Sequence, residues 1–461
     1  MDFGDRSALE QARALRRREV TSEALTREVL SRIERLNPSL GAFVSVFEAR
    51  ALRAAGAADK RLEKGSAGQG PVFLGVPTGI KDLDFVRGSW ARMGSRAFRH
   101  FWSPVDGPVT ARVRRGGFVI VGKLATSELA IMPITETDIH PPCVNPWDLG
   151  RAAGGSSGGS ASAVAAGVLS IAQASDGAGS IRIPASFCHL VGFKMSRGVL
   201  PNFYGPFDPA GMTTVGSVTR TVEDTAAMLD VLVGRSYDPR SPSSGSFLEA
   251  CSRPPSGLKI GFSDQSPLGE ADPAVSAAAR GIIGVLEGLG YSVEEGGEVE
   301  RRALDDFLPI YGYMASCVPV LRESDLQPPT RWLRQQGRKT GRRAVKAMAR
   351  GLVERIDAHF GDFDVWISPT VPVSPPEIGA WRGLDGEGQF RAAARLGSFT
   401  AVYNLSGQPA ISLPLGVING LPVGVQLAAR RGQDAMLLAL ARQIEQASPW
   451  SGRRAPLVRP G

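Results

Sequence analysis

The fold of this chain depends on two loops, Gly154-Gly155-Ser156-Ser157-Gly158-Gly159 and Asp176-Gly177-Ala178-Gly179-Ser180-Ile181-Arg182-Ile183-Pro184. Between them, the small side chains of residues 161–166 predict a helix built for close backbone packing. Residues 169–172 predict a short strand that leads to the second loop. A loop, a helix, a strand and a glycine-rich turn thus follow one another, which is typical of a sheet covered by helices.

The same alternation continues on both sides of these loops. Residues 72–80 predict an extended apolar segment that ends on Lys81, and residues 109–124 predict a helix that leads into a buried strand at 118–121. Later strands are predicted at 364–369, 409–413 and 423–427, the last two separated by a turn at Asn419-Gly420, and a final helix spans about 434–447. One large α/β domain accounts for this order.

The domain organisation follows from where helices dominate. Residues 1–65 are predicted to form helices that pack on the core, one of them beginning at Thr21-Ser22-Glu23 and ending at Asn37-Pro38. Residues 66–461 are predicted to form the α/β domain. A helical, basic insertion is expected within it, at about 258–385.

Composition limits the classes of function. The chain has 461 residues, 43% of them hydrophobic and 21% charged, with a net charge of +8. Residues 331–350 carry eight basic side chains and no acid, so this segment alone matches the excess, and a solvated helix face is favoured over a patch that steers an anionic partner. We therefore expect no nucleic-acid partner.

Cysteines and apolar segments point to a cytoplasmic protein without a metal. Four cysteines lie far apart and show no metal-ligand spacing, which predicts reduced thiols. The N-terminal residues lack the apolar segment of a secretory signal, and no apolar run is long enough to span a bilayer. We expect no association with a membrane, and the sequence leaves a homodimer open.

The candidate chemistry is nucleophilic attack by a serine. None of the four histidines lies in a serine-hydrolase motif, although His189 is close to Ser180 and is a rival base. Lys81 follows an apolar segment, where a lysine rarely lies at the surface. A free lysine has a pKa of about 10.4, so a lysine that acts as a base at neutral pH requires a pKa lowered by about 2–3 units. Burial of the amine can produce a shift of this size. A proton relay from Ser180 to Ser156 to Lys81 is predicted, with the glycine-rich turn as oxyanion hole.

Simpler explanations exist for each residue alone. A lysine such as Lys81, taken alone, is more often the ion-pair partner of a residue such as Asp82 or Asp84, and Ser180 taken alone is a turn residue. A glycine-serine loop is usually a flexible connection, or a phosphate cradle when Gly-Lys-Ser/Thr follows, which is not the case here. The joint occurrence of all three residues favours the relay.

These motifs resemble the amidase signature family over most of the chain. The resemblance runs from Gly75-Val76-Pro77 and Lys81-Asp82 through the two loops and Gly192-Phe193-Lys194 to Gly407-Gln408-Pro409-Ala410 and residues 420–426. It implies a mixed sheet sandwiched by helices, and amide hydrolysis or acyl transfer through an acyl-enzyme without a cofactor. Within the family, residues 174–184 with Asn145-Pro146-Trp147 look most like the 6-aminohexanoate cyclic dimer hydrolases.

The resemblance also implies roles for individual residues. Lys81 matches the catalytic lysine, Ser156 the cis-serine and Ser180 the nucleophile. The backbone of Gly177, Ala178, Gly179 and Ser180 matches the oxyanion hole, and Ser157, Asp176 and Arg182 are expected to support the site. Ala178, Met195 and His189 depart from the usual pattern around the nucleophile, which puts the substrate in doubt more than the chemistry.

The substrate is less constrained than the chemistry. Phe203, Tyr204 and Phe207, with Trp90 and Trp102, are candidates to line an apolar acyl pocket, although core packing explains each equally well. We expect a small or medium amide with an apolar or aromatic acyl group. The alternatives are an amide-forming acyltransferase of a biosynthetic pathway, an amidotransferase A-type subunit, and a catalytically silent binding protein.

Overall fold

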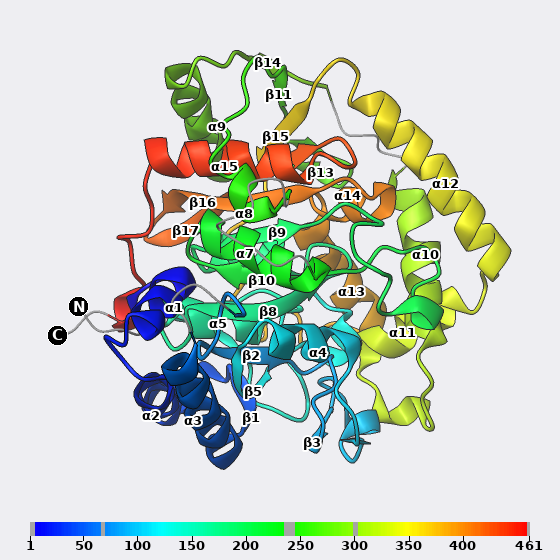
Figure 1. Cartoon of the computed structure of the whole chain (residues 1–461). Coiled ribbons are helices and arrows are strands. Elements are labelled where there is room, and N and C mark those ends of the chain that lie inside the picture. The colour runs from blue at the N-terminus through cyan, green and yellow to red at the C-terminus, as the bar shows by residue number, and fades with distance from the viewer. Residues whose placement is uncertain (1–4, 66–69, 235–244, 298–302, 459–461) are drawn as a thin grey trace.

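The computed structural model describes residues 5–65, 70–234, 245–297 and 303–458. An eight-stranded sheet forms its centre, in the order β14-β11-β15-β17-β16-β9-β10-β8 (Figure 1). β14, β11 and β15 are parallel and the remaining pairs are antiparallel. The strands are β8 (Ile171–Asp176), β9 (Val191–Lys194), β10 (Thr214–Thr219), β11 (Ile260–Phe262), β14 (Val293–Glu295), β15 (Val365–Pro369), β16 (Ala410–Ile418) and β17 (Leu421–Ala429).

A second sheet places Lys81 beside the first. It consists of β1 (Phe43–Val46), β5 (Val119–Leu124) and β2 (Pro77–Lys81), with β2 parallel and β1 antiparallel to β5. The Thr78 hydroxyl donates to the Ile171 carbonyl of β8 at 3.0 Å, and the Lys81 N–H donates to Gln173 Oε1 of β8 at 2.9 Å. The last residue of β2 therefore lies against the end of β8.

Helices cover both sides of the large sheet, which confirms the predicted fold class (Figure 1). α10, α11 and α12 gather on one side of the molecule in that view. The helices are α1 (Ala8–Arg16), α2 (Ser22–Leu40), α3 (Glu48–Lys64), α4 (Pro108–Arg115), α5 (Gly158–Ala165), α6 (Arg182–Phe187), α7 (Val222–Val233), α8 (Phe247–Ala250), α9 (Pro273–Gly288), α10 (Ala303–Cys317), α11 (Pro328–Gly337), α12 (Arg342–His359), α13 (Gly386–Ala394), α14 (Ala401–Ser406) and α15 (Asp434–Ala447). Short two-stranded pairs are formed by β3 (Ser89–Trp90) with β4 (Trp102–Ser103), β6 (Val144–Asn145) with β7 (Asp148–Ala152), and β12 (Gln265–Ser266) with β13 (Gly269–Glu270).

The largest apolar core lies between the eight-stranded sheet and the helices α7, α9 and α15. Phe193 and Leu427 of the sheet belong to the same buried cluster as Leu229 of α7, Ile282 of α9 and Leu438 of α15. A second buried cluster joins the small residues of α5 to β5 and β8. The predicted helix of tiny side chains is thus enclosed between two sheets.

One predicted helix boundary is wrong. α2 does not end at Asn37-Pro38 but continues to Leu40, and Gly41 ends it with a φ of +60°. Pro38 lies in the last turn and its missing N–H costs one intrahelical bond, but the helix continues past it, and the Gly41 N–H donates to the Asn37 carbonyl at 2.9 Å. The Asn37 side chain instead bonds the backbone of Phe43, at 2.7 and 3.0 Å, and so ties the helix end to β1.

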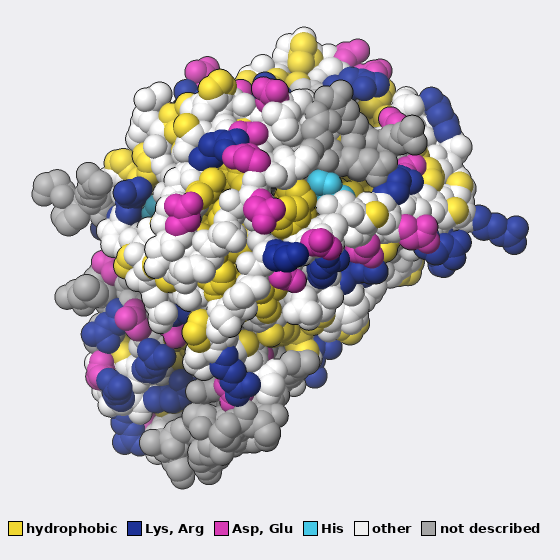
Figure 2. All heavy atoms as spheres, turned by 90° about the horizontal axis from the view of Figure 1, so that it is seen from above, with side chains coloured by type: hydrophobic (Ala, Val, Ile, Leu, Met, Phe, Trp, Pro, Cys, Tyr) yellow, Lys and Arg dark blue, Asp and Glu magenta, His cyan; other side chains and the backbone are white. Residues whose placement is uncertain are grey.

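The basic segment 331–350 lies on α11 and α12, and part of it is paired. Arg334 Nη2 lies 2.9 Å from Glu323 Oε1, and Arg338 also pairs with Glu323. On the face that Figure 2 shows, basic side chains are interspersed with acidic ones. Among the described residues, no helix combines the length and the apolar character needed to cross a bilayer. Residues 66–69, next to the predicted boundary between 1–65 and 66–461, and residues 1–4, used to predict the localisation, lie outside the described part of the chain.

The close packing of α5 can be tested with one substitution made at two glycines. A Cβ atom at Gly159 would meet the backbone of Ala125, with the carbonyl oxygen 2.8 Å away, whereas a Cβ atom at Gly56 of α3 meets nothing within 4 Å. We expect Gly159→Ala to lower the free energy of unfolding by about 1–3 kcal/mol. The control Gly56→Ala should raise it by up to about 1 kcal/mol, because alanine favours a helix. Denaturant unfolding of both variants measures this; equal effects would contradict the packing of α5.

Candidate active site

Lys81 is the centre of the candidate site. Its side chain is fully buried, and Nζ donates to Ser156 Oγ at 2.7 Å and to Ser175 Oγ at 3.1 Å. The alternative of an ion pair does not hold, since Asp82 pairs with Lys123 at 2.9 Å and no ion pair within the described residues includes Lys81. The structure thus brings together the predicted lysine and the first predicted serine.

The surroundings of Lys81 favour its neutral form. Burial lowers the pKa of Lys81 to about 7, although the charges of Asp84 and Asp176 oppose that shift. Near neutral pH a substantial fraction of the amine is therefore uncharged and has a lone pair. Across the same 2.7 Å contact, a neutral amine accepts a proton from Ser156.

The first glycine-serine loop holds Ser156 in place through close backbone contacts. Gly154 has a φ of +83°, and a Cβ atom there would lie 2.9 Å from the Pro184 Cα. The peptide bond between Gly155 and Ser156 is cis. The hydroxyl of Ser157 donates to the Ser175 carbonyl at 3.2 Å, which fixes the loop against the end of β8.

The second loop presents free backbone donors beside Ser180. Within the described structure, the N–H groups of Gly177, Ala178 and Ser180 have no hydrogen-bond acceptor. Gly179 differs, because its N–H donates to Asp176 Oδ1 at 2.6 Å. Three of the four predicted oxyanion donors are therefore available, and the fourth is used to shape the turn.

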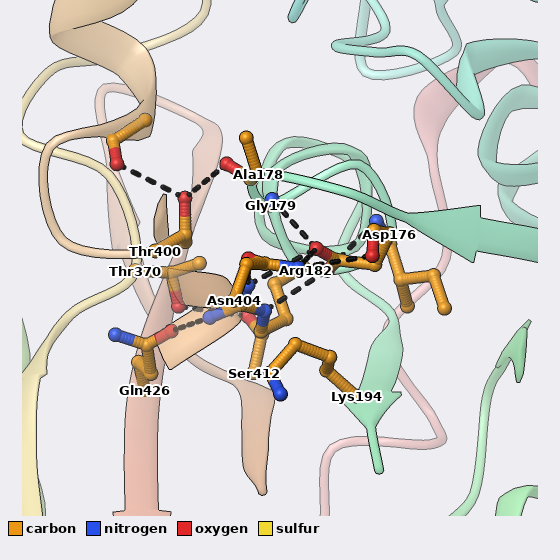
Figure 3. Close-up of polar contacts among 12 residues, drawn as sticks. Asp176, Ala178, Gly179, Arg182, Lys194, Thr370, Thr400, Asn404, Ser412 and Gln426 are labelled. Atoms are coloured by element: carbon orange, nitrogen blue, oxygen red, sulfur yellow. Dashed lines mark hydrogen bonds and ion pairs between the residues drawn. The ribbon is translucent and has the colours of Figure 1, made fainter. Parts of the chain in front are cut away.

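A buried ion pair holds this turn in shape. Arg182 Nε lies 3.0 Å from Asp176 Oδ2, and both side chains are fully buried. Arg182 also donates to Asn404 Oδ1 and to Gln426 Oε1, at 2.6 and 2.7 Å, and Figure 3 shows the guanidinium among these groups. Although burial alone raises the pKa of a carboxyl group, the charge and hydrogen bonds of Arg182 hold the pKa of Asp176 well below its usual range.

A cavity of about 400 Å³ opens next to these residues. Ser156, Ser175 and Gly177 line it, together with the predicted aromatic residues; these are Phe203, Tyr204 and Phe207. Trp90 and Trp102 were predicted at the same pocket but do not line it. They lie on β3 and β4, both partly exposed, with their rings edge to face at 5.2 Å. They face each other because β3 pairs with β4 in register.

The rival base, His189, lies elsewhere. It is buried with its ring edge to face against Trp147, at 5.2 Å between centroids, and does not line the cavity. Burial lowers its pKa to about 4. Its sequence proximity to Ser180 does not bring it to Ser156 or Lys81.

Several residues of the site escaped the sequence analysis. Ser175 contacts the Lys81 amine, and Gln173 binds the Lys81 backbone while its Nε2 donates to Asp84 Oδ2 at 2.9 Å. Lys194 is a further buried lysine, whose pKa burial lowers to about 7. Ser175 stands immediately before the glycine-rich turn, and Asp84 stands three residues after Lys81. This proximity in the sequence to predicted site residues is the feature from which both could have been predicted.

Comparisons with known proteins find similar chains over almost the whole length. The family model for Amidase matches residues 24–438. A putative amidase from Synechocystis sp. is 35% identical over 459 residues, covering 96% of this chain and 89% of the relative. A 6-aminohexanoate-cyclic-dimer hydrolase from Pseudomonas sp. is 33% identical over 495 residues, covering 98% and 97%. A solved 6-aminohexanoate cyclic dimer hydrolase, complexed with substrate, is 31% identical with a TM-score of 0.87, and both chains are covered completely.

The burial of Lys81 should be visible in the pH dependence of stability. Between the lowered pKa of about 7 and the pKa of about 10.4 of an unfolded chain, only the unfolded state binds the proton, so stability rises with pH. The variant Lys81→Met lacks this effect. We therefore compare the free energy of unfolding of Lys81→Met with that of the wild type. Between about pH 7.5 and about pH 9.5, the wild-type value should rise relative to that of the variant by about 2 kcal/mol. Denaturant unfolding of both proteins gives the difference, and a constant difference would contradict the lowered pKa.

Proposed function

This chain belongs to the amidase family, as a hydrolase that acts on amide C–N bonds, and we propose that it cleaves its substrate through a relay of Ser180, Ser156 and Lys81. The observation that carries the proposal is the 2.7 Å contact between a fully buried Lys81 amine and Ser156 Oγ. A lysine with a pKa near neutrality is able to act as a base at neutral pH.

In the proposed acylation, the three side chains act in turn. Ser180 Oγ attacks the amide carbon, its proton passes to Ser156, and the Ser156 proton passes to the neutral Lys81 amine. The proton then returns through Ser156 to the leaving nitrogen, and the C–N bond breaks. Water attacks the resulting acyl-enzyme by the same route.

The free N–H groups of the turn stabilise the charge that forms on the carbonyl oxygen. Gly177, Ala178 and Ser180 supply up to three donors, and Asp176 fixes their direction through Gly179 and Ile181. Removal of one such donor in serine hydrolases costs about 3–4 kcal/mol of transition-state stabilisation. The buried Asp176–Arg182 pair thus acts on catalysis by keeping the donors aligned.

The cavity supports a small or medium amide with an apolar or aromatic acyl group. Its volume of about 400 Å³ lies within the usual range for small-molecule sites, and most of its lining is apolar. The similarity to 6-aminohexanoate cyclic dimer hydrolases also favours a small amide substrate. Phe203 and Phe207 are the proposed contacts of the acyl group.

The nucleophile can be tested with a fluorophosphonate probe. We expect covalent labelling of Ser180, no labelling of Ser180→Ala, and a loss of labelling rate of about 10²–10⁴-fold in Lys81→Ala, because general-base catalysis contributes that much. Ser162→Ala is the matched control, since this hydroxyl donates to the Val144 carbonyl at 2.9 Å, away from the relay. Mass spectrometry locates the label. A folded wild-type protein without label at Ser180 would overturn the proposal.

The base can be tested through the pH dependence of amide hydrolysis. Because only neutral Lys81 accepts a proton, kcat/KM for a non-ionising amide should fall as the pH decreases through about 7. Protonation of a single base predicts a decrease of about tenfold per pH unit below that value. A profile that stays flat down to about pH 5, where the fold is shown by circular dichroism to persist, would exclude Lys81 as the base.

A further inference from the structure

Asp84 is an acidic group that the relay does not use, and it lines the same cavity as Ser156. It stands three residues after Lys81 and is 6% exposed. Its Oδ2 accepts a hydrogen bond from Gln173 Nε2 at 2.9 Å. Within the described part of the chain, its Oδ1 accepts only from the Tyr204 hydroxyl, at 3.3 Å, so one carboxylate oxygen retains capacity for a further donor.

The lysines near Asp84 form no ion pair with it when Lys81 is neutral and able to act as the base. Lys123 and Lys81 are the two cations whose charge acts on Asp84. Lys123 forms its ion pair with Asp82 at 2.9 Å and reaches only the backbone carbonyl of Asp84. Lys81 must be neutral to accept a proton. In that state, no ion pair among the described residues includes Asp84, and only the charge of Lys123 still acts on it. Burial raises the pKa of Asp84 to about 6, so most of this carboxyl group is still ionised near neutral pH.

The residues that line the cavity favour the binding of a cationic group carried by a ligand. None of the described residues that line it is Lys, Arg or His. Phe85, Phe203, Tyr204 and Phe207 supply aromatic rings, whose faces attract an ammonium group. The other acidic lining residue, Asp208, is already occupied by the N–H groups of Met212 and Thr213, at 3.0 and 2.6 Å. Asp84 is therefore the carboxylate available to a substrate.

We propose that Asp84 determines substrate specificity by binding a protonated amine carried by the amide substrate. This inference rests on the proposed function and narrows its substrate class to amides with an ammonium group on an apolar chain. The ammonium binds between Asp84 and the aromatic rings, while the amide carbon lies at the turn that contains Ser180. The competing explanation is that Asp84 serves only as an acceptor for Gln173 and Tyr204.

A matched pair of substrates separates these explanations. One anilide has an acyl chain that ends in an ammonium group, and its partner has a methyl group in that place; both are prepared in a series of chain lengths. At the best length, we expect wild-type kcat/KM for the ammonium anilide to exceed that of the methyl anilide by at least about tenfold, as expected for a hydrogen bond to a charged group. Asp84→Asn keeps the size and should reduce this ratio to about one or less.

Tyr204→Phe is the matched control, because it removes the hydroxyl that donates to Asp84 but keeps the carboxylate and the aromatic ring. Its ratio should remain above one, whereas equal ratios in Tyr204→Phe and Asp84→Asn would overturn the proposal. So would a wild-type enzyme that labels at Ser180 but favours no ammonium anilide, a measurement that does not depend on the folding of a variant. Absence of both labelling and hydrolysis would instead overturn the proposed function itself.

Discussion

Desolvation of the Lys81 amine is the constraint on which the rest of the site depends. An ammonium group in water holds its proton far above neutral pH, and only removal of that water brings its pKa to about 7. The two sheets achieve this jointly, since Lys81 ends β2 while Ser175 and Gln173 belong to β8, and α5 is enclosed between them. Neither sheet alone encloses the amine. Gly159 at the start of α5 is part of this arrangement, because a Cβ atom there would meet the backbone of Ala125.

The turn that contains Ser180 depends on a different interaction, the buried pair of Asp176 and Arg182. The Asp176 carboxylate accepts hydrogen bonds from the N–H groups of Gly179 and Ile181. Because Arg182 holds this carboxylate in an ion pair, it also fixes the orientation of the turn and of its neighbouring N–H groups. A buried ion pair adds little net stability, because desolvation offsets the attraction. Its value here lies in geometry, since it fixes a turn whose glycine has a φ of +117° and leaves three donors free.

The sequence predicted the features that carry a conspicuous motif, and missed those built from residues without one. Strand β2 and the contact of Lys81 with Ser156 were accessible because an apolar segment ends on a lysine and a glycine-serine loop is conspicuous. Asn404 and Gln426 were missed because they reach Arg182 from more than two hundred residues away. The end of α2 was wrong because Pro38 removes one intrahelical bond without ending the helix, which ends instead at Gly41 with its positive φ. The sequence did not indicate which way Trp90 and Trp102 point, because an aromatic side chain is equally common in a ligand pocket and across a pair of strands.

The charges of Lys81 and Asp84 act on each other, and Asp84 lines the cavity beside the relay. This coupling links substrate binding to catalysis. The charge of Asp84 opposes the burial that lowers the pKa of Lys81. A substrate ammonium beside Asp84 cancels this effect and favours the neutral amine. By linkage, neutral Lys81 then also binds such a substrate more tightly. An acidic residue placed next to a lysine base, which on its own would hinder catalysis, thus becomes a means of preferring a charged substrate.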